Sequence, residues 1–586
     1  MGTQLQSDFT IPQEDVSVER AAVLESVRSA YGYRMDYGVP VADGFRAEDE
    51  PALEWQAKSL FHQEMLHLHL RTLVRSGKWT FAGDTPKLEL PTLVKLIHDK
   101  DFERIFHYFV PKMGVPTENA RGASLDDFRA VFADSQLPAV AATLQSDDTF
   151  AEYYVAGPDP TRLQRLESIP AKFPISTEHL STVPGVPAST DLLTEINAGR
   201  VFWVDYEAMD TMDNGTHPLG TKYMYSPMVA FIARPQGIAP FAIQCGQDPA
   251  GRQIYTLADG WSWRMAKNCV LVAHNTYHTV ITHLGRTHLL SEAVLLATGR
   301  NLAAHHPVAA LLQRHFEGTF FINRLAVDLL IQPGEAIEIL VGTSLSSMYK
   351  LLANKRRNYS FSGNYLPRRF ARQGTDSHSA LARYPYRDDG LLVWNAIARW
   401  ATDFVEAYYR KDDDVRADYE LQAWAAEIAS PDWGQVTEFG ATPGAIQDRQ
   451  DLAEILTMIM WTAGPQHAAV NFTQAPYLSY LPANPLAGFA PEPTGTAHTK
   501  QDWIAQFPPI DVAIQHYTTF TFLSSVNHTR LGQYGSIFSG TDAEAANRRF
   551  QAALEDIEAS ITTANAARAV EYPYLLPSRI PNSTNI

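Results

Sequence analysis

The amino-acid sequence predicts a mainly α-helical protein that contains one small β-sheet. From Trp261 almost to the end of the chain, apolar residues recur at helical spacing. Within this part, the segment Met265–His288 is apolar on nearly all sides, which is typical of a helix at the centre of a large protein. Before it, short apolar runs rich in strand-forming residues and separated by Gly and Pro predict strands at 201–204, 228–232 and 241–243.

Another helix is predicted near the N-terminus, between Ala47 and Arg75. Two adjacent lines of apolar residues recur there at helical spacing: Leu53, Ala57, Leu60, Phe61, Met65 and Leu68, then Leu66, Leu70, Leu73 and Val74. So wide a stripe indicates two buried faces or a helix that lies on a membrane surface, and the plainer interpretation is a core-facing helix. Residues 1–45 are mixed and polar, and we interpret them as an N-terminal extension.

Composition excludes several classes of protein. The chain has 586 residues, 45% of them hydrophobic, which is enough for one large core or a few domains. A formal net charge of −17 argues against a nucleic-acid partner, because such partners require a basic surface. The two cysteines, Cys245 and Cys269, form neither a disulfide framework nor a CxxC motif, which fits a reducing compartment.

Targeting and cofactor motifs are also absent from the sequence. The start of the chain lacks the basic and apolar regions of a signal peptide, and no apolar run approaches the length of about 18 residues that spans a membrane. We therefore expect a soluble, cytoplasmic protein, with peripheral membrane contact as the alternative. No GxSxG, P-loop or GxGxxG motif occurs.

Histidines supply the clearest chemical signal. Five of the 19 histidines form a spaced array within 38 residues: His278, His283, His288, His306 and His315. Residues five apart lie about 140° apart around a regular α-helix, too far to share a metal ion. A π-helical turn would bring them onto one face, so a local π-helical segment is predicted between His283 and His288. A lone buried histidine is more often a hydrogen-bonded core residue, but five at this spacing favour a metal site. Imidazole suits iron, copper and zinc, so histidine alone does not choose the metal.

Two further segments offer ligands. His467 and Asn471 are four apart, hence on one helical face, and an amide oxygen could join an imidazole on the same ion. The sequence ends on Ile586 after a polar turn, and its α-carboxylate is a candidate ligand. By contrast His62, His67 and His69 do not form an HExxH motif, and we interpret them as helix-surface or core histidines.

The array His278-x4-His283-x4-His288-x17-His306-x8-His315 resembles the signature of the lipoxygenase family. The short segments at Thr287–Glu292, His306-Pro307 and Ile322-Asn323 resemble the residues that flank this signature. The segments at 467–471 and 576–586 resemble the downstream ligand helix and the C-terminus of the family. The phrases at 384–389 and 464–467 are most similar to the bacterial, especially cyanobacterial, branch. In motif terms the resemblance covers residues 201–586.

This resemblance implies a lipoxygenase-type catalytic domain with long central helices and a single metal ion. The implied ligands are His283, His288, His467, Asn471 and the α-carboxylate of Ile586. His278, His306 and His315 match signature members that do not bind the metal. Gln474 matches a glutamine that hydrogen-bonds the ligating amide, and such outer partners orient and tune ligands. Thr279 departs from the family, which often has glutamine at this position. The hydrogen-bond link between the metal site and the substrate cavity is therefore expected to be altered or bridged by water.

The resemblance also implies a substrate pocket. Leu330 and Ile514 resemble a pair of bulky aliphatic residues that clamp the substrate near the metal, although plain core packing explains either one as well. Ala326 occupies the position at which alanine usually accompanies S products. Counting back from the ligands leaves too little sequence for the family's N-terminal β-barrel, so we expect none. The expected division is an extension at 1–45 and a catalytic domain at 46–586, whose helix at 46–76 serves as a lid or membrane contact.

The implied activity is that of a non-haem iron dioxygenase, with manganese as the alternative metal. It would insert O2 into polyunsaturated fatty acids of the linoleate and arachidonate type, giving hydroperoxides. One alternative on the same fold is a hydroperoxide isomerase or epoxyalcohol synthase. Another is a non-catalytic lipid-binding homologue, against which the retention of all five ligand positions argues. The sequence does not reveal the oligomeric state.

Overall fold

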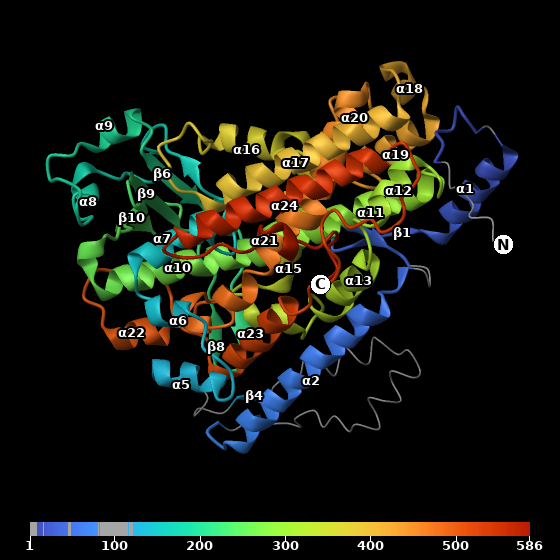
Figure 1. The fold of residues 1–586 in the computed structure, drawn as a ribbon. Helices are drawn as coiled ribbons and strands as arrows, with labels where there is room; N and C mark the ends of the chain where they lie inside the picture. The colour runs from blue at the N-terminus through green and yellow to red at the C-terminus, as the bar shows by residue number, and fades with distance from the viewer. Residues whose placement is uncertain (1–8, 16, 45–48, 80, 83–114, 117–120) are drawn as a thin grey trace.

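The computed structural model describes residues 9–15, 17–44, 49–79, 81–82, 115–116 and 121–586. Its centre is a continuous helical rod made of α10 (Trp261–Tyr277), the π-helix η6 (His278–His288) and α11 (Leu289–Asn301). Every residue of η6 except Arg286 is buried, as predicted for a helix that is apolar on nearly all sides. The long helices α17 (Pro385–Tyr408) and α24 (Glu544–Ala566) pack on each other and extend in the same direction as this rod (Figure 1).

Most other elements are also helices, so the mainly α-helical fold class is confirmed. In the part of the chain that the structure describes, the other α-helices are α1 (Val18–Ala30), α2 (Leu53–Arg75), α5 (Leu125–Arg129), α6 (Val140–Thr143), α7 (Asp147–Ala156), α8 (Thr177–Leu180), α9 (Leu192–Asn197), α12 (Pro307–Gln313), α13 (Thr319–Leu329), α14 (Ala336–Leu340), α15 (Leu345–Arg357), α16 (Leu366–Gln373), α18 (Asp412–Ala417), α19 (Tyr419–Ala429), α20 (Arg449–Trp461), α21 (His467–Asn471), α22 (Lys500–Ala505) and α23 (Ile510–Leu523). Two further π-helices are η8 (Thr462–Gln466) and η9 (Gln474–Leu478). Short 3-10 turns are η3 (Ala130–Phe132), η4 (Glu207–Met209), η5 (Leu257–Asp259), η7 (Ser362–Asn364), η10 (Leu481–Ala483) and η11 (Pro577–Arg579).

The predicted small sheet lies at one end of the molecule, beside α7, α8 and α9 (Figure 1). It is antiparallel, in the order β10 (Gly237–Gln244), β9 (Met228–Arg234), β6 (Val201–Asp205) and β5 (Gln164–Arg165). Three of these strands contain the predicted runs, so the strand predictions are confirmed. The other strands of the described residues form two-stranded antiparallel sheets: β1 (Tyr33–Asp36) with β2 (Val39–Ala42), β3 (Phe81–Ala82) with β4 (Val115–Pro116), and β7 (Gly215–His217) with β8 (Gly220–Lys222).

The helix predicted near the N-terminus is present as α2. The expected domain boundary and the first two residues expected in the helix fall at residues 45–48, outside the described part of the chain. Residues 49–52 are described and are not α-helical, so the helix begins at Leu53, later than the predicted Ala47. One apolar line, containing Leu66, Leu70 and Leu73, is buried. The other is not, because Leu53 is 82% exposed and Phe61 64% exposed. The helix therefore has one buried face rather than two, and its second apolar line remains at the surface.

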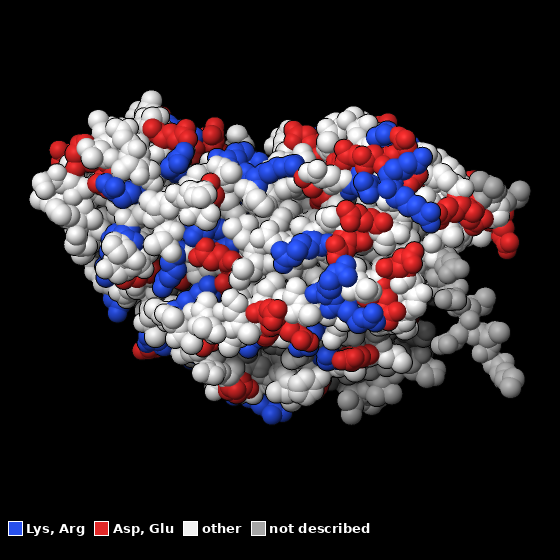
Figure 2. All heavy atoms as spheres, turned by 45° about the horizontal axis from the view of Figure 1, so that its top comes forward, with Lys and Arg blue, Asp and Glu red and all other residues white. Residues whose placement is uncertain are grey.

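Two further properties bear on possible partners: the distribution of surface charge and the presence of helices able to span a membrane. On the face that Figure 2 shows, the acidic and basic side chains of the described residues are interspersed. No helix among the described residues has the length and apolar character needed to cross a membrane.

Candidate metal centre

The π-helix η6 aligns the first histidines. It spans eleven residues, from His278 to His288, and is therefore longer than the segment predicted between His283 and His288. Because a π-helix bonds residue i to residue i+5, residues five apart fall on one side of it. The rings of His278 and His283 are nearly parallel, with centroids 5.9 Å apart, and those of His283 and His288 lie 4.8 Å apart. The predicted π-helical segment is confirmed.

His467 reaches the same point from a second interrupted helix. Between α20 and α21, the π-helical turn η8 contains Pro465, which has no backbone N–H to donate and would break a regular helix. A π-helical turn accommodates it and places His467 at the start of α21. Gly464 allows close packing here, because a Cβ atom at this position would lie 2.9 Å from the carbonyl oxygen of Pro581. The C-terminal segment therefore runs directly against the helix that carries His467.

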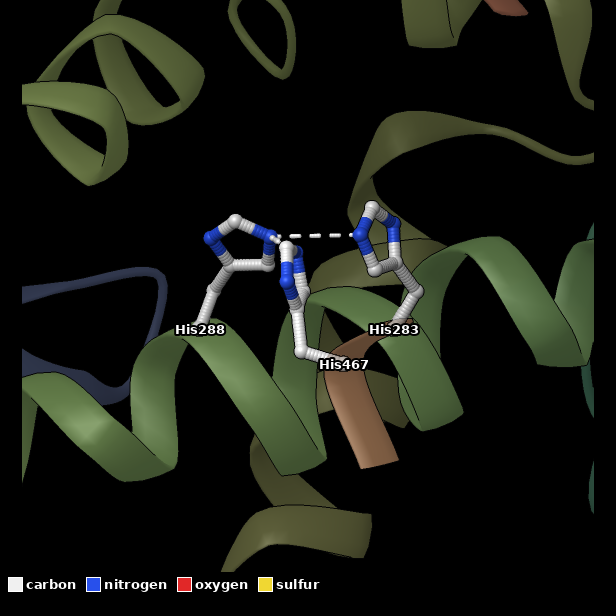
Figure 3. A group of neighbouring side chains, drawn as sticks. All are labelled: His283, His288 and His467. Carbon is white, nitrogen blue, oxygen red and sulfur yellow. Dashed lines mark hydrogen bonds between the residues drawn. The ribbon is translucent and has the colours of Figure 1, made fainter. Parts of the chain in front are cut away.

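Three imidazoles converge in the interior. The Nε2 atom of His288 lies 3.2 Å from Nε2 of His283 and 3.1 Å from Nε2 of His467. Figure 3 shows the rings turned toward one another, two from one helix and the third from another segment. All three residues are buried, and among the described residues they form the one cluster of histidine, cysteine and carboxylate side chains able to hold a metal ion.

Asn471 lies one helical turn beyond His467, as predicted. Its Oδ1 atom accepts a hydrogen bond of 2.7 Å from Nε2 of Gln474, and its Nδ2 atom donates one of 2.8 Å to the carbonyl oxygen of Leu523. His283 also lies within hydrogen-bonding reach of Asn471. The amide is thus held on both sides, with its oxygen at the histidine cluster.

Ile586 lies beside His467 in the interior. Its O atom lies 3.1 Å from Nε2 of His467, and the residue is fully buried. In Figure 1 the C-terminus lies in the middle of the molecule. The preceding residues are anchored, since Nδ1 of His315 donates to the carbonyl oxygen of Asn582 at 2.9 Å and Nε1 of Trp55 donates to that of Asn585 at 2.5 Å.

Burial keeps these imidazoles neutral. It lowers the pKa of His288 to about 4, and it lowers the pKa of His283 and of His467 well below the usual value. A neutral imidazole presents a lone pair, which is the form that binds metals. Two ligand nitrogens at a right angle, each about 2.1 Å from one ion, would lie about 3.0 Å apart. The observed separations of 3.1 and 3.2 Å fit such an ion.

The other signature histidines have structural partners. Nε2 of His278 donates to the carbonyl oxygen of Val470 at 2.8 Å. His306 caps α12 and pairs with the buried Asp418. His315 bridges Asn582 and the hydroxyl of Tyr534. On α2, His67 and His69 are buried, and His69 pairs with Asp134, so these residues lie outside the cluster.

The predicted pocket residues are buried but lie on different elements. Ala326 lies near the C-terminal end of α13, Leu330 directly follows that helix, and Ile514 lies on α23. Thr279, the departure from the family pattern, has its hydroxyl 3.5 Å from Nδ1 of His278. From the sequence no role is predicted for Asn323, yet its Oδ1 atom accepts a hydrogen bond of 2.7 Å from Nδ1 of His288. The one signal pointing to this contact was its place in the signature flank.

Comparison with known proteins identifies the family. The family description named Lipoxygenase matches residues 136–573, which is most of the chain. The chain belongs to the lipoxygenase family. It is 40% identical over 493 residues to a linoleate 9/13-lipoxygenase of Pseudomonas aeruginosa, covering 80% of this chain and 71% of that protein. It is 30% identical to an allene oxide synthase-lipoxygenase protein of Plexaura homomalla, covering 79% of this chain and 46% of that protein.

A solved structure gives the same result. An anaerobic crystal structure of a lipoxygenase deletion variant in complex with arachidonate is 26% identical, with a TM-score of 0.84. The match covers 99% of this chain and 83% of that chain. Lipoxygenases are dioxygenases that use a non-haem metal, and the histidine cluster provides a place for one. The predicted family, its bacterial character and the dioxygenase class of enzyme are confirmed.

Proposed function

We propose that this lipoxygenase binds iron and inserts O2 into polyunsaturated fatty acids such as linoleate or arachidonate, giving fatty-acid hydroperoxides. The observation that carries the proposal is the meeting of the three imidazoles with Asn471 and Ile586 in one buried place. The relatives named for linoleate and solved with arachidonate support the substrate class.

In this proposal the ligands are His283, His288, His467, Asn471 and the α-carboxylate of Ile586. Three imidazoles, an amide oxygen and a carboxylate suit iron, and manganese is the alternative because the preferred ligands overlap. Iron held there would supply the one-electron chemistry that removes a hydrogen atom from a bis-allylic carbon. Gln474 orients the Asn471 oxygen toward the ion, and burial excludes bulk water from the site.

The remaining work of the chain is to position the substrate. We propose that Leu330 and Ile514 clamp the fatty acid beside the metal from α13 and α23, and that Ala326, one turn before Leu330, sets an S product. The 40% identity to a linoleate lipoxygenase favours the dioxygenase over the isomerase alternative.

The test is a direct assay of metal-loaded protein with linoleate and with arachidonate. Oxygen uptake and conjugated-diene absorbance are expected with at least one of them, and chiral chromatography resolves the products. His288→Ala should abolish uptake and deplete bound metal, measured by elemental analysis. A matched control is His306→Ala, which removes a buried signature histidine outside the cluster and should leave metal bound in the protein that folds. Absence of uptake with both substrates would refute the proposal.

We further propose that residues 46–586 form the catalytic domain, with 1–45 as an extension, and that α2 contacts a lipid surface. Phe61, Met65 and Leu68 are 64%, 51% and 45% exposed and follow one another at helical spacing. An exposed apolar face of this kind lies favourably in a lipid interface, where the proposed substrate also partitions.

Sedimentation with phosphatidylcholine vesicles tests this contact. The variant Phe61→Glu/Met65→Glu should lose most vesicle binding while keeping activity on dispersed linoleate. Leu193→Glu is the control, since Leu193 is 57% exposed on the distant helix α9. Unchanged vesicle binding together with a changed KM for dispersed linoleate would contradict the membrane contact and favour a lid.

A further inference from the structure

A buried carboxylate lies near the histidine cluster that we propose binds the metal, and it has no part in the function proposed so far. Glu292 is on α11, four residues beyond His288, and is 3% exposed. Its Oε2 atom accepts a hydrogen bond of 2.9 Å from Nδ2 of Asn323, and its Oε1 atom accepts one of 2.7 Å from the backbone N–H of Ala42. Asn323, fully buried on α13, is the same residue that contacts His288.

The hydrogen bonds fix the orientation of the Asn323 amide. Its Nδ2 atom donates to Oε2 of Glu292 and to the carbonyl oxygen of His288, both at 2.9 Å. Both hydrogens of the NH2 group are thereby used, and Oδ1 must face Nδ1 of His288, 2.7 Å away. An oxygen at this place accepts only from an Nδ1–H group, so the proton of His288 is on Nδ1. The lone pair is then on Nε2, the atom that faces His283 and His467.

We propose that Glu292 is a positioning residue that, through Asn323, fixes the tautomer and ring orientation of His288 for metal binding. This inference rests on the proposed function, in which His288 is a ligand. Only a carboxylate fits the position, because two N–H donors face its two oxygens. A glutamine would place an NH2 group against either Ala42 or Asn323, and the second choice favours a flipped amide that donates to Nδ1 of His288 instead of accepting from it.

The series of hydrogen bonds from Ala42 through Glu292 and Asn323 to His288 extends beyond the segment that matches the family description. Ala42 belongs to β2, which pairs with β1 and packs on α11. The family match begins at residue 136. A hairpin near the N-terminus therefore supplies one of the two donors that hold Glu292, and it links the N-terminal part of the chain to a metal ligand.

The experiment compares Glu292→Gln with a matched control, Glu420→Gln. Glu420 is also a buried carboxylate, 1% exposed, but it pairs with Arg20 and a backbone N–H away from the cluster. Glu292→Gln should lower metal affinity or kcat about 10- to 100-fold, as outer partners of metal ligands do, with a smaller change in KM. It should also alter the electron paramagnetic resonance spectrum of the ferric protein, whereas Glu420→Gln should affect stability alone.

A double substitution guards against a folding defect. Asn323→Asp alone sets two carboxylates against each other. Combined with Glu292→Gln, the NH2 group of the new amide donates to the new carboxylate, and the carbonyl oxygen of that amide still accepts from Ala42. The bond from position 323 to the carbonyl oxygen of His288 stays lost in both Asn323→Asp and the pair, so the recovery is partial. Each single variant should be impaired, and the pair should recover at least part of the lost metal binding and the wild-type spectrum. A wild-type spectrum and kcat in Glu292→Gln, or a pair that binds metal no better than Asn323→Asp alone, would overturn the proposed role of Glu292. His288→Ala measured in parallel separates the cases: if it retains full metal, the proposed ligand set fails instead.

Discussion

Nε2 of His467 lies 3.1 Å from the O atom of Ile586, although 119 residues separate them. The contact depends on the final residues being buried against η8, where Gly464 leaves room for the carbonyl oxygen of Pro581. The end of the chain is therefore built into the centre of the molecule, beside the cluster that we propose binds the metal.

Removal of Ile586 should abolish activity and release the metal. The deletion moves the α-carboxylate back by one residue, and a carboxylate displaced by about 3.5 Å cannot replace it. Elemental analysis and oxygen uptake measure the two effects. Ile586→Val is the control, because it keeps the carboxylate in place and changes one methylene. Full activity in the truncated protein would show that the carboxylate is not a ligand.

Gln474→Leu should weaken metal binding about 10- to 100-fold, because it removes the donor that holds the oxygen of Asn471. Competition with a chelator measures the metal affinity. Gln244→Leu is a matched control, since Gln244 is an equally buried glutamine that bonds backbone carbonyls near the sheet. Similar metal affinity in the two variants would contradict a specific role for Gln474.

Gly285→Ala should disturb the turn that carries the ligands. Gly285 lies between His283 and His288, and an added Cβ atom would lie 2.9 Å from Cδ1 of Leu352 on α15. Overpacking of this kind costs about 1–3 kcal/mol, and the shift should also reduce bound metal. Urea denaturation and elemental analysis test both. Leu352→Ala in the same chain should relieve the contact, so the double variant should be more stable than the sum of the single effects predicts.

Acid should destabilise the fold partly through His315. Burial lowers the pKa of His315 from its usual 6.5 to about 4, so the unfolded chain binds the proton more tightly than the folded one. The stability from this residue is complete above about pH 6.5 and is lost as the pH falls toward 4, amounting to about 3 kcal/mol. His315→Asn should therefore show a shallower fall in unfolding free energy between pH 7 and pH 4 by urea denaturation. An equally steep fall would contradict this assignment.

The local patterns of the sequence predicted much of the architecture. Hydrophobic spacing predicted α2, the central rod and three strands of the sheet, because the apolar residues that face the core recur with the period of the helix or strand. The five-residue steps between His278, His283 and His288 predicted a π-helix, since no regular α-helix aligns them. The spacing of His467 and Asn471 and the position of Ile586 offered further ligands, and the resemblance to lipoxygenases joined them with His283 and His288 into one set.

Other features, such as which face of a helix is buried, depend on tertiary packing and do not follow from hydrophobic periodicity. Either apolar line of α2 could have been the buried one, because periodicity locates a stripe but not its partner; the fold buries Leu66 and Leu70 and leaves Phe61 at the surface. The orientation of His288 likewise depends on Asn323, Glu292 and Ala42, which come from three separate segments. The sequence by itself determined the residue types and local helical geometry of the site. Only the tertiary structure determined which hydrogen-bond partners face them, because these contacts join residues far apart in the chain.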